Sequence, residues 1–309
     1  MQQPSTVLVT GASSGIGHAT AALLADRGHR VYAAARNQAV LDRLAENHHL
    51  AALHLDVTDP QSIVSARDRI DTETAGQGPD VVINAAGTAI LGPVEAIPDA
   101  LLRSHFDTNV FGTLAVIRVF LPTMRARRAG RIVNISSVLG RFALPGTGVY
   151  AAGKYALEAL SDALRVELAP FGISVTLVEP GIVNTPLYQK AATTAAEYLD
   201  ELIPYDALFP QGVAFPDELA RTAMTPQQVG KTVANVATAR RPKARYVIGA
   251  RNRLNVRLLT TMPSAATDRT KRRLMDLHSA APTERHQPTP DTRYYHEPGR
   301  LGRKVEEGE

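Results

Sequence analysis

Residues 6–17 read T-V-L-V-T-G-A-S-S-G-I-G, and this stretch decides the fold of the chain. Its first five residues form a short apolar run typical of a β-strand, and three glycines follow with the spacing G-x-x-x-G-x-G. An alanine- and leucine-rich amphipathic run over 19–24 then predicts a helix. A strand, a glycine-rich turn and a helix in this order predict a site where the backbone approaches a pyrophosphate at a helix N-terminus.

The rest of the chain continues the same alternation. Strand-type runs are found at 7–9, 30–34, 51–55, 81–84, 131–136, 174–179 and 244–248, and helix-type runs between them at 39–46, 60–72, 101–124 and 150–169. This alternation favours right-handed βαβ units. The predicted fold is a doubly wound parallel sheet of the α/β class, with three α/β/α layers in a single domain.

Composition excludes several other classes of protein. Of the 309 residues, 44% are hydrophobic and 21% charged, which permits a substantial core, and the chain has no cysteine. A disulfide framework, a thiolate nucleophile and a cysteine-based zinc site are therefore excluded, and no metal site is expected. The chain has no apolar run of about 18–20 residues and no signal-peptide pattern at its start, so a cytoplasmic protein is expected.

Three side chains with complementary proton chemistry follow the fifth predicted strand. Tyr150 and Lys154 stand four residues apart, so a helix starting near residue 149 places both on one face. A phenol with a pKa of about 10 is a poor acid or base at neutral pH, and an adjacent ammonium lowers that pKa. Ser137, at the end of the preceding strand, is placed to hold a carbonyl or alcohol oxygen. Together these residues predict a proton-transfer site.

Four motifs now stand in order: T-G-A-S-S-G-I-G at 10–17, N-A-A-G at 84–87, a serine thirteen residues before Y-x-x-x-K at 150–154, and P-G at 180–181. In this order and spacing they resemble the short-chain dehydrogenase/reductase family, in its ordinary single-domain type with an extended C-terminal tail. The resemblance covers about residues 5–250 and implies a Rossmann fold. It also implies hydride transfer between a nicotinamide cofactor and a carbonyl or secondary alcohol.

The resemblance implies roles for four catalytic residues. Tyr150 gives or takes the proton on the substrate oxygen, Ser137 orients that oxygen, and Lys154 lowers the phenol pKa and holds the nicotinamide ribose. Asn109 lies in an otherwise apolar predicted helix, where a buried amide needs partners. The family implies that Asn109 kinks the helix through a main-chain contact and holds a water in a proton relay to the lysine. A satisfied core asparagine is the plainer interpretation.

Cofactor contacts are expected at the carboxyl ends of the strands. Arg36 follows the second strand, and Ala35 stands where the family often has an acid, so a 2′-phosphate suits this position and NADP(H) is favoured over NAD(H). A solvated loop charge is the plainer interpretation of Arg36. Asp56 is similar to a carboxylate that holds the adenine amino group, and capping of the next helix is the alternative. The expected contacts are Gly11, Ser13, Ser14, Gly15, Ile16, Gly17, Arg36, Asp56, Val57, Asn84, Ala85, Ala86, Gly87, Tyr150, Lys154, Pro180, Gly181, Ile182, Val183 and Thr185.

Three further segments are predicted beyond residue 185. Residues 186–226 combine aromatic and aliphatic side chains with prolines, which is typical of a mobile lid over an apolar pocket. Residues 251–280 form a basic helical extension: between 239 and 278, eleven Lys and Arg stand against two Asp, a balance of +9 in a chain of net charge +4. A helix over the pocket or a weak peripheral membrane contact would explain it, whereas nucleic-acid binding lacks the interleaved aromatics. Residues 281–309 are expected to be disordered.

The predicted function is therefore an NADP(H)-dependent oxidoreductase that reduces a bulky apolar ketone or aldehyde of steroid, retinoid, acyl or polyketide type. An NAD-dependent alcohol dehydrogenase is the alternative among enzymes. A non-catalytic NADP-sensing or scaffold protein is the alternative from another class, and such a protein should have lost Tyr150 or Lys154. Surplus apolar positions on the helices predicted at 101–124 and 150–169 favour a homodimer or homotetramer.

Overall fold

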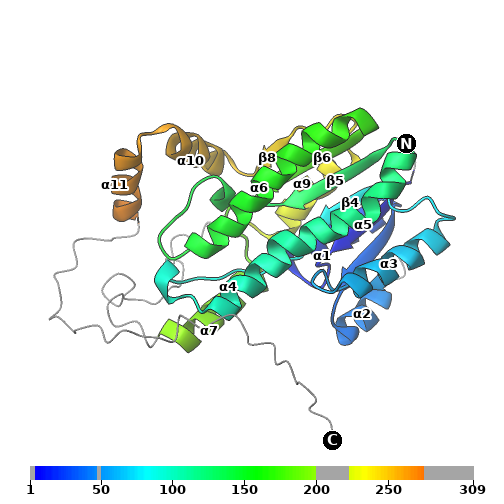
Figure 1. Ribbon diagram of the computed structural model, residues 1–309, viewed down its shortest axis with the longest axis horizontal. Coiled ribbons are helices and arrows are strands. Elements are labelled where there is room, and N and C mark those ends of the chain that lie inside the picture. Colours follow the sequence, from blue (N-terminus) through cyan, green and yellow to red (C-terminus); the bar gives the residue numbers. More distant parts are fainter. Residues whose placement is uncertain (1–3, 47–49, 200–222, 275–309) are drawn as a thin grey trace, which may run out of the picture.

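The computed structural model of the chain describes residues 4–46, 50–199 and 223–274, which form one seven-stranded parallel sheet flanked by helices (Figure 1). The strand order is β3-β2-β1-β4-β5-β6-β8, which reverses between β1 and β4 and confirms the predicted doubly wound sheet. The strands are β1 (Thr6–Thr10), β2 (Arg30–Ala35), β3 (Leu50–His54), β4 (Val81–Asn84), β5 (Gly130–Ile135), β6 (Ile173–Glu179) and β8 (Arg245–Val247).

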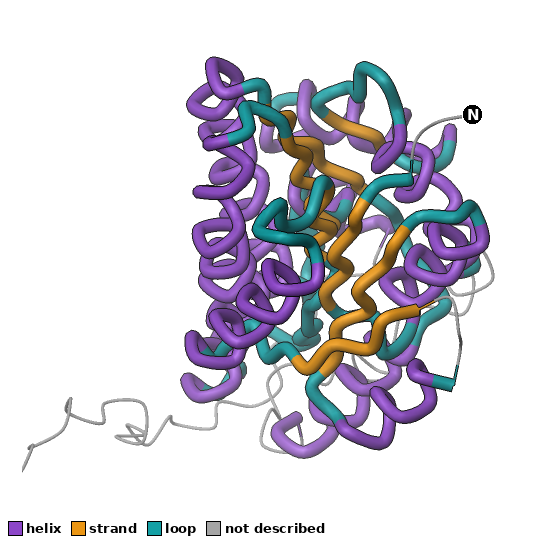
Figure 2. The backbone as a smooth tube through the Cα atoms, turned by 90° about the vertical axis from the view of Figure 1, so that its right-hand side faces the viewer, coloured by secondary structure: helices purple, strands orange, loops and turns teal. Residues whose placement is uncertain are grey.

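Helices cover both faces of the sheet, as the tube in Figure 2 shows from the side. They are α1 (Gly15–Asp26), α2 (Gln38–Ala45), α3 (Pro60–Glu73), α4 (Asp99–Phe106), α5 (Thr113–Ala126), α6 (Gly148–Leu168), α7 (Pro186–Leu199), α9 (Pro226–Thr238), α10 (Ala250–Thr261) and α11 (Ser264–Leu274). Short 3₁₀ turns occur at Val94–Ala96, Val138–Gly140 and Ala169–Phe171. The three layers agree with the fold predicted from the alternation of strands and helices.

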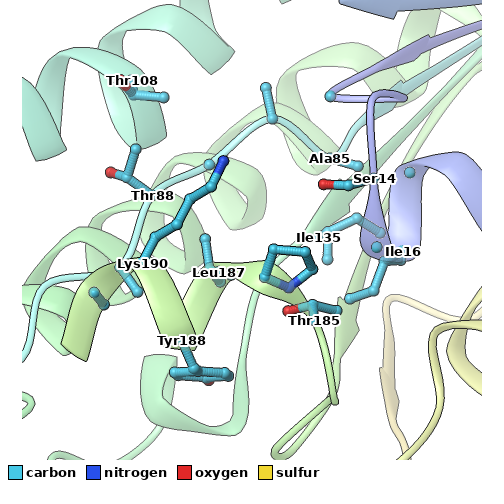
Figure 3. A pocket seen from close by; sticks show the side chains of 18 of the residues that line it. Ser14, Ile16, Ala85, Thr88, Thr108, Ile135, Thr185, Leu187, Tyr188 and Lys190 are labelled. Atoms are coloured by element: carbon cyan, nitrogen blue, oxygen red, sulfur yellow. The ribbon is translucent and has the colours of Figure 1, made fainter. Parts of the chain in front are cut away.

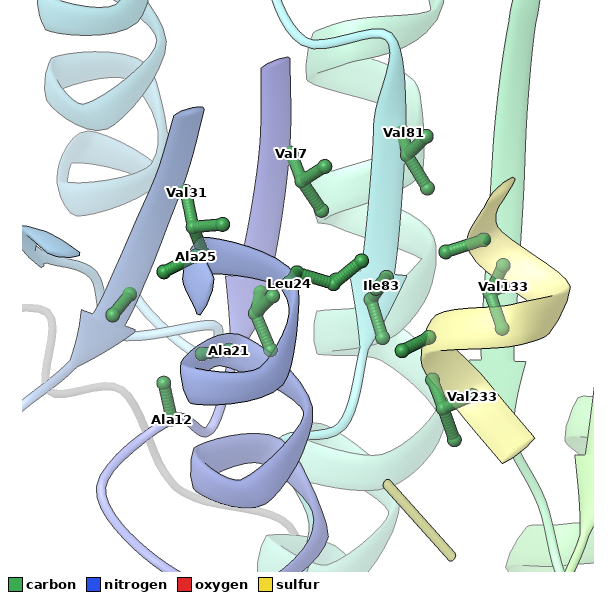
Figure 4. Close-up of a cluster of buried hydrophobic side chains, with 14 of the residues drawn as sticks. Val7, Ala12, Ala21, Leu24, Ala25, Val31, Val81, Ile83, Val133 and Val233 are labelled. Carbon is green, nitrogen blue, oxygen red and sulfur yellow. The ribbon is translucent and has the colours of Figure 1, made fainter. Parts of the chain in front are cut away.

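The core divides into two clusters because successive strand residues point to opposite faces of the sheet. On β1, Val7 and Val9 face α1 and α9, where Leu24 and Val233 meet them (Figure 4). Leu8 faces the other way and packs in the cluster formed by α3, α5 and α6. Strands buried on both faces read as continuous apolar runs, which is why the sequence located them within one or two residues.

The helix predicted at 101–124 is interrupted by a π-helical segment, Asp107–Gly112, between α4 and α5. Gly112 ends this segment, and a Cβ there would lie 2.8 Å from the Val57 carbonyl oxygen, so only glycine fits without a shift. The run predicted as a helix at 101–124 is therefore two helices, and the kink that the family resemblance implies at Asn109 lies between them. The irregular turn lies beside the end of β3 and carries Asn109.

The segments beyond β6 are described only in part. Helix α7 forms the first part of the predicted lid, while residues 200–222 lie outside the described residues, as does the predicted tail at 281–309. Helices α10 and α11 form in the predicted basic extension. None of the helices in the described part of the chain is long and apolar enough to span a membrane.

Candidate active site

A cavity of about 390 Å³ opens at the carboxyl ends of the strands, between the glycine-rich turn, α6 and α7 (Figure 3). The predicted cofactor contacts line this cavity, apart from Asp56, Asn84 and Ile182. Ser137 lines it as well, whereas Asn109 lies behind its wall. The backbone of Ile182 instead pairs with Met224, where the chain returns to the sheet after the lid segment. Residues that are distant in the sequence thus meet at the carboxyl ends of the strands, as predicted.

The glycine-rich turn is built by close backbone packing. Gly11 has φ +66°, and a Cβ on it would lie 2.6 Å from the backbone of Ala86. The Thr10 hydroxyl accepts hydrogen bonds from the backbone N–H groups of Ala85 and Ala86 at 3.1 and 3.2 Å. Gly17 is equally constrained, because its Cβ would lie 2.4 Å from the Gly11 carbonyl oxygen. The turn requires glycine at both positions.

The N-terminus of α1 faces this cavity with its polar groups available. Ser14, its N-cap residue, makes no side-chain capping hydrogen bond, and the first turn of α1 contains no acidic residue. No Asp or Glu appears among the described residues that line the cavity, whereas Arg36, Lys154 and Lys190 do. A helix N-terminus with cationic side chains and no carboxylate suits an anionic ligand. These residues therefore fit the phosphates of a dinucleotide.

The cavity has two arms: the cofactor arm is lined by the glycine-rich turn, the start of α1 and Arg36, and the catalytic arm by Ser137, Tyr150 and Lys154. Arg36 and Asp56 form a loose ion pair at the end of the cofactor arm. The Arg36 Nη1 lies 3.8 Å from an Asp56 carboxylate oxygen, and the Arg36 side chain is 63% exposed. The other Asp56 oxygen accepts hydrogen bonds from the backbone N–H and the hydroxyl of Thr58. The alternative that Asp56 caps the next helix was wrong, because Asp59 caps α3 by accepting from the Gln61 N–H.

The predicted proton-transfer residues meet at the other arm of the cavity. Helix α6 places Tyr150 and Lys154 on one face, and both are buried together with Ser137. The Tyr150 hydroxyl hydrogen-bonds with the side chains of Ser137 and Tyr188. Lys154 donates to the Ile135 carbonyl oxygen at 2.9 Å, and its Nζ lies 5.8 Å from the Tyr150 ring centroid. Contacts within the protein therefore position these side chains.

The electrostatics of this arm differ from the prediction. Burial raises the pKa of Tyr150, and the hydrogen bonds with Ser137 and Tyr188 only partly oppose that effect. The expectation that Lys154 lowers the phenol pKa was wrong for this structure, because the ammonium is directed to the Ile135 carbonyl. Burial instead lowers the pKa of Lys154 to about 8, although the nearby Glu158 carboxylate raises it. The phenol therefore keeps its proton at neutral pH.

Asn109 is a buried amide whose two ends bind one backbone segment. The Thr88 N–H donates to Asn109 Oδ1 at 2.8 Å, and Asn109 Nδ2 donates to the Thr88 carbonyl at 2.9 Å. A Cβ on Gly87 would lie 3.3 Å from Asn109 Oδ1 and 4.0 Å from Lys154 Nζ, so the glycine lets both groups approach the cavity. The main-chain contact and the irregular helix are present as expected. The water relay stays a prediction.

Asn84 has an architectural position. Its Nδ2 donates to Asn134 Oδ1 at 2.8 Å, and Asn134 Nδ2 donates to the Ser161 hydroxyl at 2.9 Å. This buried chain joins β4, β5 and α6, and thereby seats the helix that carries Tyr150.

Three residues of the site were not assigned from the sequence. His105 is buried one turn before Asn109, and its ring centroid lies 5.9 Å from that of Tyr150. Burial, and then the charge of Lys154, lower the pKa of His105 to about 4, so the imidazole is neutral. Tyr188 and Lys190 lie in the predicted lid at 186–226, and the sequence predicts no separate role for either. The only signal in the sequence that could have indicated His105 is its four-residue spacing from Asn109.

Two buried carboxyl groups, one on α6 and one on β6, share the same arginine. Glu179 ends β6 and Glu158 follows Lys154 on α6, and Arg245 Nε lies 3.3 Å and 2.9 Å from their respective oxygens. Arg141 reaches the same Glu179 oxygen at 3.6 Å. Burial, and then the charge of Glu158, raise the pKa of Glu179 to about 7.

Comparison with known proteins agrees with this geometry. A family model described as short chain dehydrogenase matches residues 5–196. Human 17-beta-hydroxysteroid dehydrogenase type 1 is 36% identical over 255 residues, which are 78% of this chain and 76% of that protein. The 3-ketodihydrosphingosine reductase of Bacteroides thetaiotaomicron is 33% identical over 248 residues, 80% of this chain and 88% of that protein.

A solved structure is similar as well. The closed form of serine dehydrogenase complexed with NADP+ has a TM-score of 0.66 and 27% identity, and the match covers 78% of this chain and 93% of that one. The fold, the match to the family model over most of the chain and the extent of identity agree. The chain belongs to the short-chain dehydrogenase/reductase family of oxidoreductases.

Proposed function

We propose that this protein is an NADP(H)-dependent carbonyl reductase acting on a bulky apolar ketone or aldehyde. The observation that carries the proposal is the buried pair of hydroxyl groups of Ser137 and Tyr150, hydrogen-bonded to each other at the wall of a cavity whose other arm suits phosphates. A substrate oxygen placed against both hydroxyls would be oriented by the serine and protonated by the phenol.

The state of Tyr150 supports reduction as the cellular direction. A phenol with a raised pKa holds its proton at neutral pH and can donate it to the oxygen of a carbonyl that is being reduced. Lys154, with a pKa of about 8, and Asn109 stand behind it as the route by which a proton returns to the phenol. NADPH, when bound, supplies the hydride that the carbonyl carbon accepts. One hydride and one proton convert the carbonyl into an alcohol.

Arg36 supports NADP(H) over NAD(H). It lines the cavity beside Ala35, so the end of β2 offers a guanidinium and no carboxylate to the adenosine ribose. Its pairing with Asp56 is long and solvent-exposed, and a 2′-phosphate with two negative charges would compete for the guanidinium effectively.

The substrate class follows from the side chains around Tyr150. Ile90, Leu101 and Leu187 line the cavity, and Tyr188 covers the phenol with its ring centroid 6.5 Å away. Such walls suit a steroid-like or long-chain carbonyl compound. The names of the two relatives, a hydroxysteroid dehydrogenase and a ketodihydrosphingosine reductase, agree with a lipid-like substrate.

We propose a homodimer or homotetramer in the cytoplasm. Phe111, Tyr155 and Val166 are exposed by 60%, 45% and 73% on the π segment and α6, where a second subunit would bury them. Leu254 and Leu258 are exposed on α10 among arginines, which supports a weak peripheral contact with an anionic membrane. Light scattering at micromolar concentration tests the assembly, and a monomer would refute it.

The cofactor proposal is tested by titrating NADPH and NADH separately into wild type and Arg36→Ala. Tighter binding of NADPH, with the preference lost in the variant, is the expected result. Equal or tighter binding of NADH would favour an NAD-dependent alcohol dehydrogenase instead. Binding of neither would leave a scaffold protein, because an NADP sensor must bind its nucleotide.

The reaction is tested by following NADPH oxidation with a panel of steroid, retinoid, acyl and polyketide carbonyl compounds. Arg36→Ala should raise the KM for NADPH and leave the rate at saturating cofactor largely unchanged, since Arg36 is remote from Tyr150. Turnover of small polar carbonyls in preference to apolar ones would reject the substrate class while leaving the reaction type intact.

A further inference from the structure

Lys190 is a cation in the cavity that the reaction proposed above does not use. It lies on α7 and lines the cavity, and it forms no ion pair with any other described residue. Figure 3 shows its amino group extending into the cavity, on the side of α7 away from Tyr188. Residues two positions apart on a helix point about 200° apart, so Lys190 and Tyr188 serve different parts of the cavity.

The position of α7 decides which part Lys190 serves. Thr185 immediately precedes this helix, and its Cγ2 would lie 3.0 Å from a Cβ on Gly15. The base of α7 therefore rests against the first residue of α1, where the N-terminal N–H groups face the cavity. Lys190 follows about one helical turn later, and in Figure 3 its amino group extends into the cavity between Thr88 and Ser14.

The alternatives for Lys190 lie in other places. The substrate oxygen belongs beside Tyr150, and Tyr188 rather than Lys190 is the α7 side chain that bonds there. The 2′-phosphate of NADP(H) belongs at Arg36, beyond the end of β2. Between these two points the described cavity residues offer no carboxylate that would neutralise Lys190.

We propose that Lys190 binds the pyrophosphate of the nicotinamide dinucleotide from the α7 side, opposite the N-terminus of α1. This inference rests on the proposed function and adds a second, cationic wall to its cofactor site. The pyrophosphate is common to NADPH and NADH, so the contact strengthens the binding of both. Lys190 thereby differs from Arg36, whose contact is specific to NADPH.

The test is a fluorescence titration of NADPH and of NADH, without substrate, into wild type, Lys190→Gln and Lys190→Arg. Loss of one charge-assisted contact should weaken both nucleotides by about tenfold and by the same factor, so the NADPH preference stays constant. The arginine variant should recover most of the affinity because it restores the positive charge. Lys231→Gln removes one exposed lysine from α9, outside the cavity, and is the matched control, with affinities equal to wild type.

Several results would overturn the assignment. Unchanged affinity for both nucleotides in Lys190→Gln would exclude a contact between Lys190 and the cofactor. A rise in KM confined to carbonyl substrates that carry an anionic group would mean that Lys190 binds the substrate instead. Weakening of NADPH alone would move the contact to the 2′-phosphate. Failure of wild type to bind either nucleotide would instead reject the proposed function, which separates that failure from one of Lys190 alone.

Discussion

The two arms of the cavity differ in how their polar groups are satisfied. On the catalytic arm, Tyr150 is bonded to two hydroxyl groups, Lys154 to a backbone carbonyl and Asn109 to the Thr88 backbone. On the cofactor arm, the N-terminus of α1 lacks a side-chain cap and Arg36 is paired only at 3.8 Å. The polar groups of the first arm bond within the protein, whereas those of the second suit an anionic ligand.

This difference indicates how the two arms contribute to turnover. Preorganised donors gain their effect because they need no reorganisation when charge develops on the substrate. N–H groups at a helix N-terminus and cations without a close partner favour the binding of an anion such as a phosphate. Changes on the catalytic arm should therefore affect rate, and changes on the cofactor arm should affect affinity.

Removal of the phenol hydroxyl should have the largest effect. Tyr150→Phe is expected to lower kcat by roughly 10²–10⁴-fold, because it deletes the proton donor, while the Kd for NADPH changes by less than about threefold. Tyr155→Phe, on the same helix but 45% exposed, is the matched control and should keep wild-type kcat. A fall in nucleotide affinity as large as the fall in rate would mean that the two arms are not separable.

Gly11→Ala should damage the cofactor arm through the backbone. Its Cβ would lie 2.6 Å from the Ala86 backbone at a residue with φ +66°, and the clash plus the strain should cost about 3 kcal/mol in the free energy of unfolding. Gly28→Ala is the control, because its φ is +82° and nothing lies within 4 Å of its Cβ. Gly28→Ala should lower the free energy of unfolding, measured in urea, by only about 1 kcal/mol. Equal costs would mean that the close approach of the two strand ends is unimportant.

The buried carboxyl behind the catalytic arm should make stability depend on pH. The folded-state pKa of Glu179 is raised to about 7 from 4.5, so the folded state holds a proton there, and the stabilisation is lost as pH rises through 7. Between pH 5 and pH 8 the free energy of unfolding of the wild type should fall by about 2 kcal/mol because of this group. In Glu179→Gln the free energy of unfolding should depend less on pH. Denaturant unfolding of both proteins at four pH values measures how the free energy of unfolding depends on pH. A steeper slope in the variant would contradict the assignment.

The sequence predicted the elements whose information is local. Strand limits, the glycine-rich turn and the pairing of Tyr150 with Lys154 depend on neighbouring residues or on helical spacing, and the structure places them together. The family resemblance added the order of the motifs.

Contacts between distant residues were not predictable in this way. The bond from Tyr188 to Tyr150 and the pairing of Arg245 with Glu158 and Glu179 depend on tertiary packing. The direction of the Tyr150 pKa was missed for the same reason. Burial of the phenol and diversion of Lys154 to the Ile135 carbonyl are set by how α6 seats on the sheet.

The π-helical segment at 107–112 makes the site sensitive to deletion of a single codon. A π-helical turn holds one residue more than an α-helical turn, so loss of Phe111, which is exposed, would return this stretch to a regular α-helix. Asn109 would then lose the irregular turn from which it holds the Thr88 backbone at both ends. Every residue of the four sequence motifs would still be present, so a reading frame with this deletion would pass a motif search and encode a misaligned site.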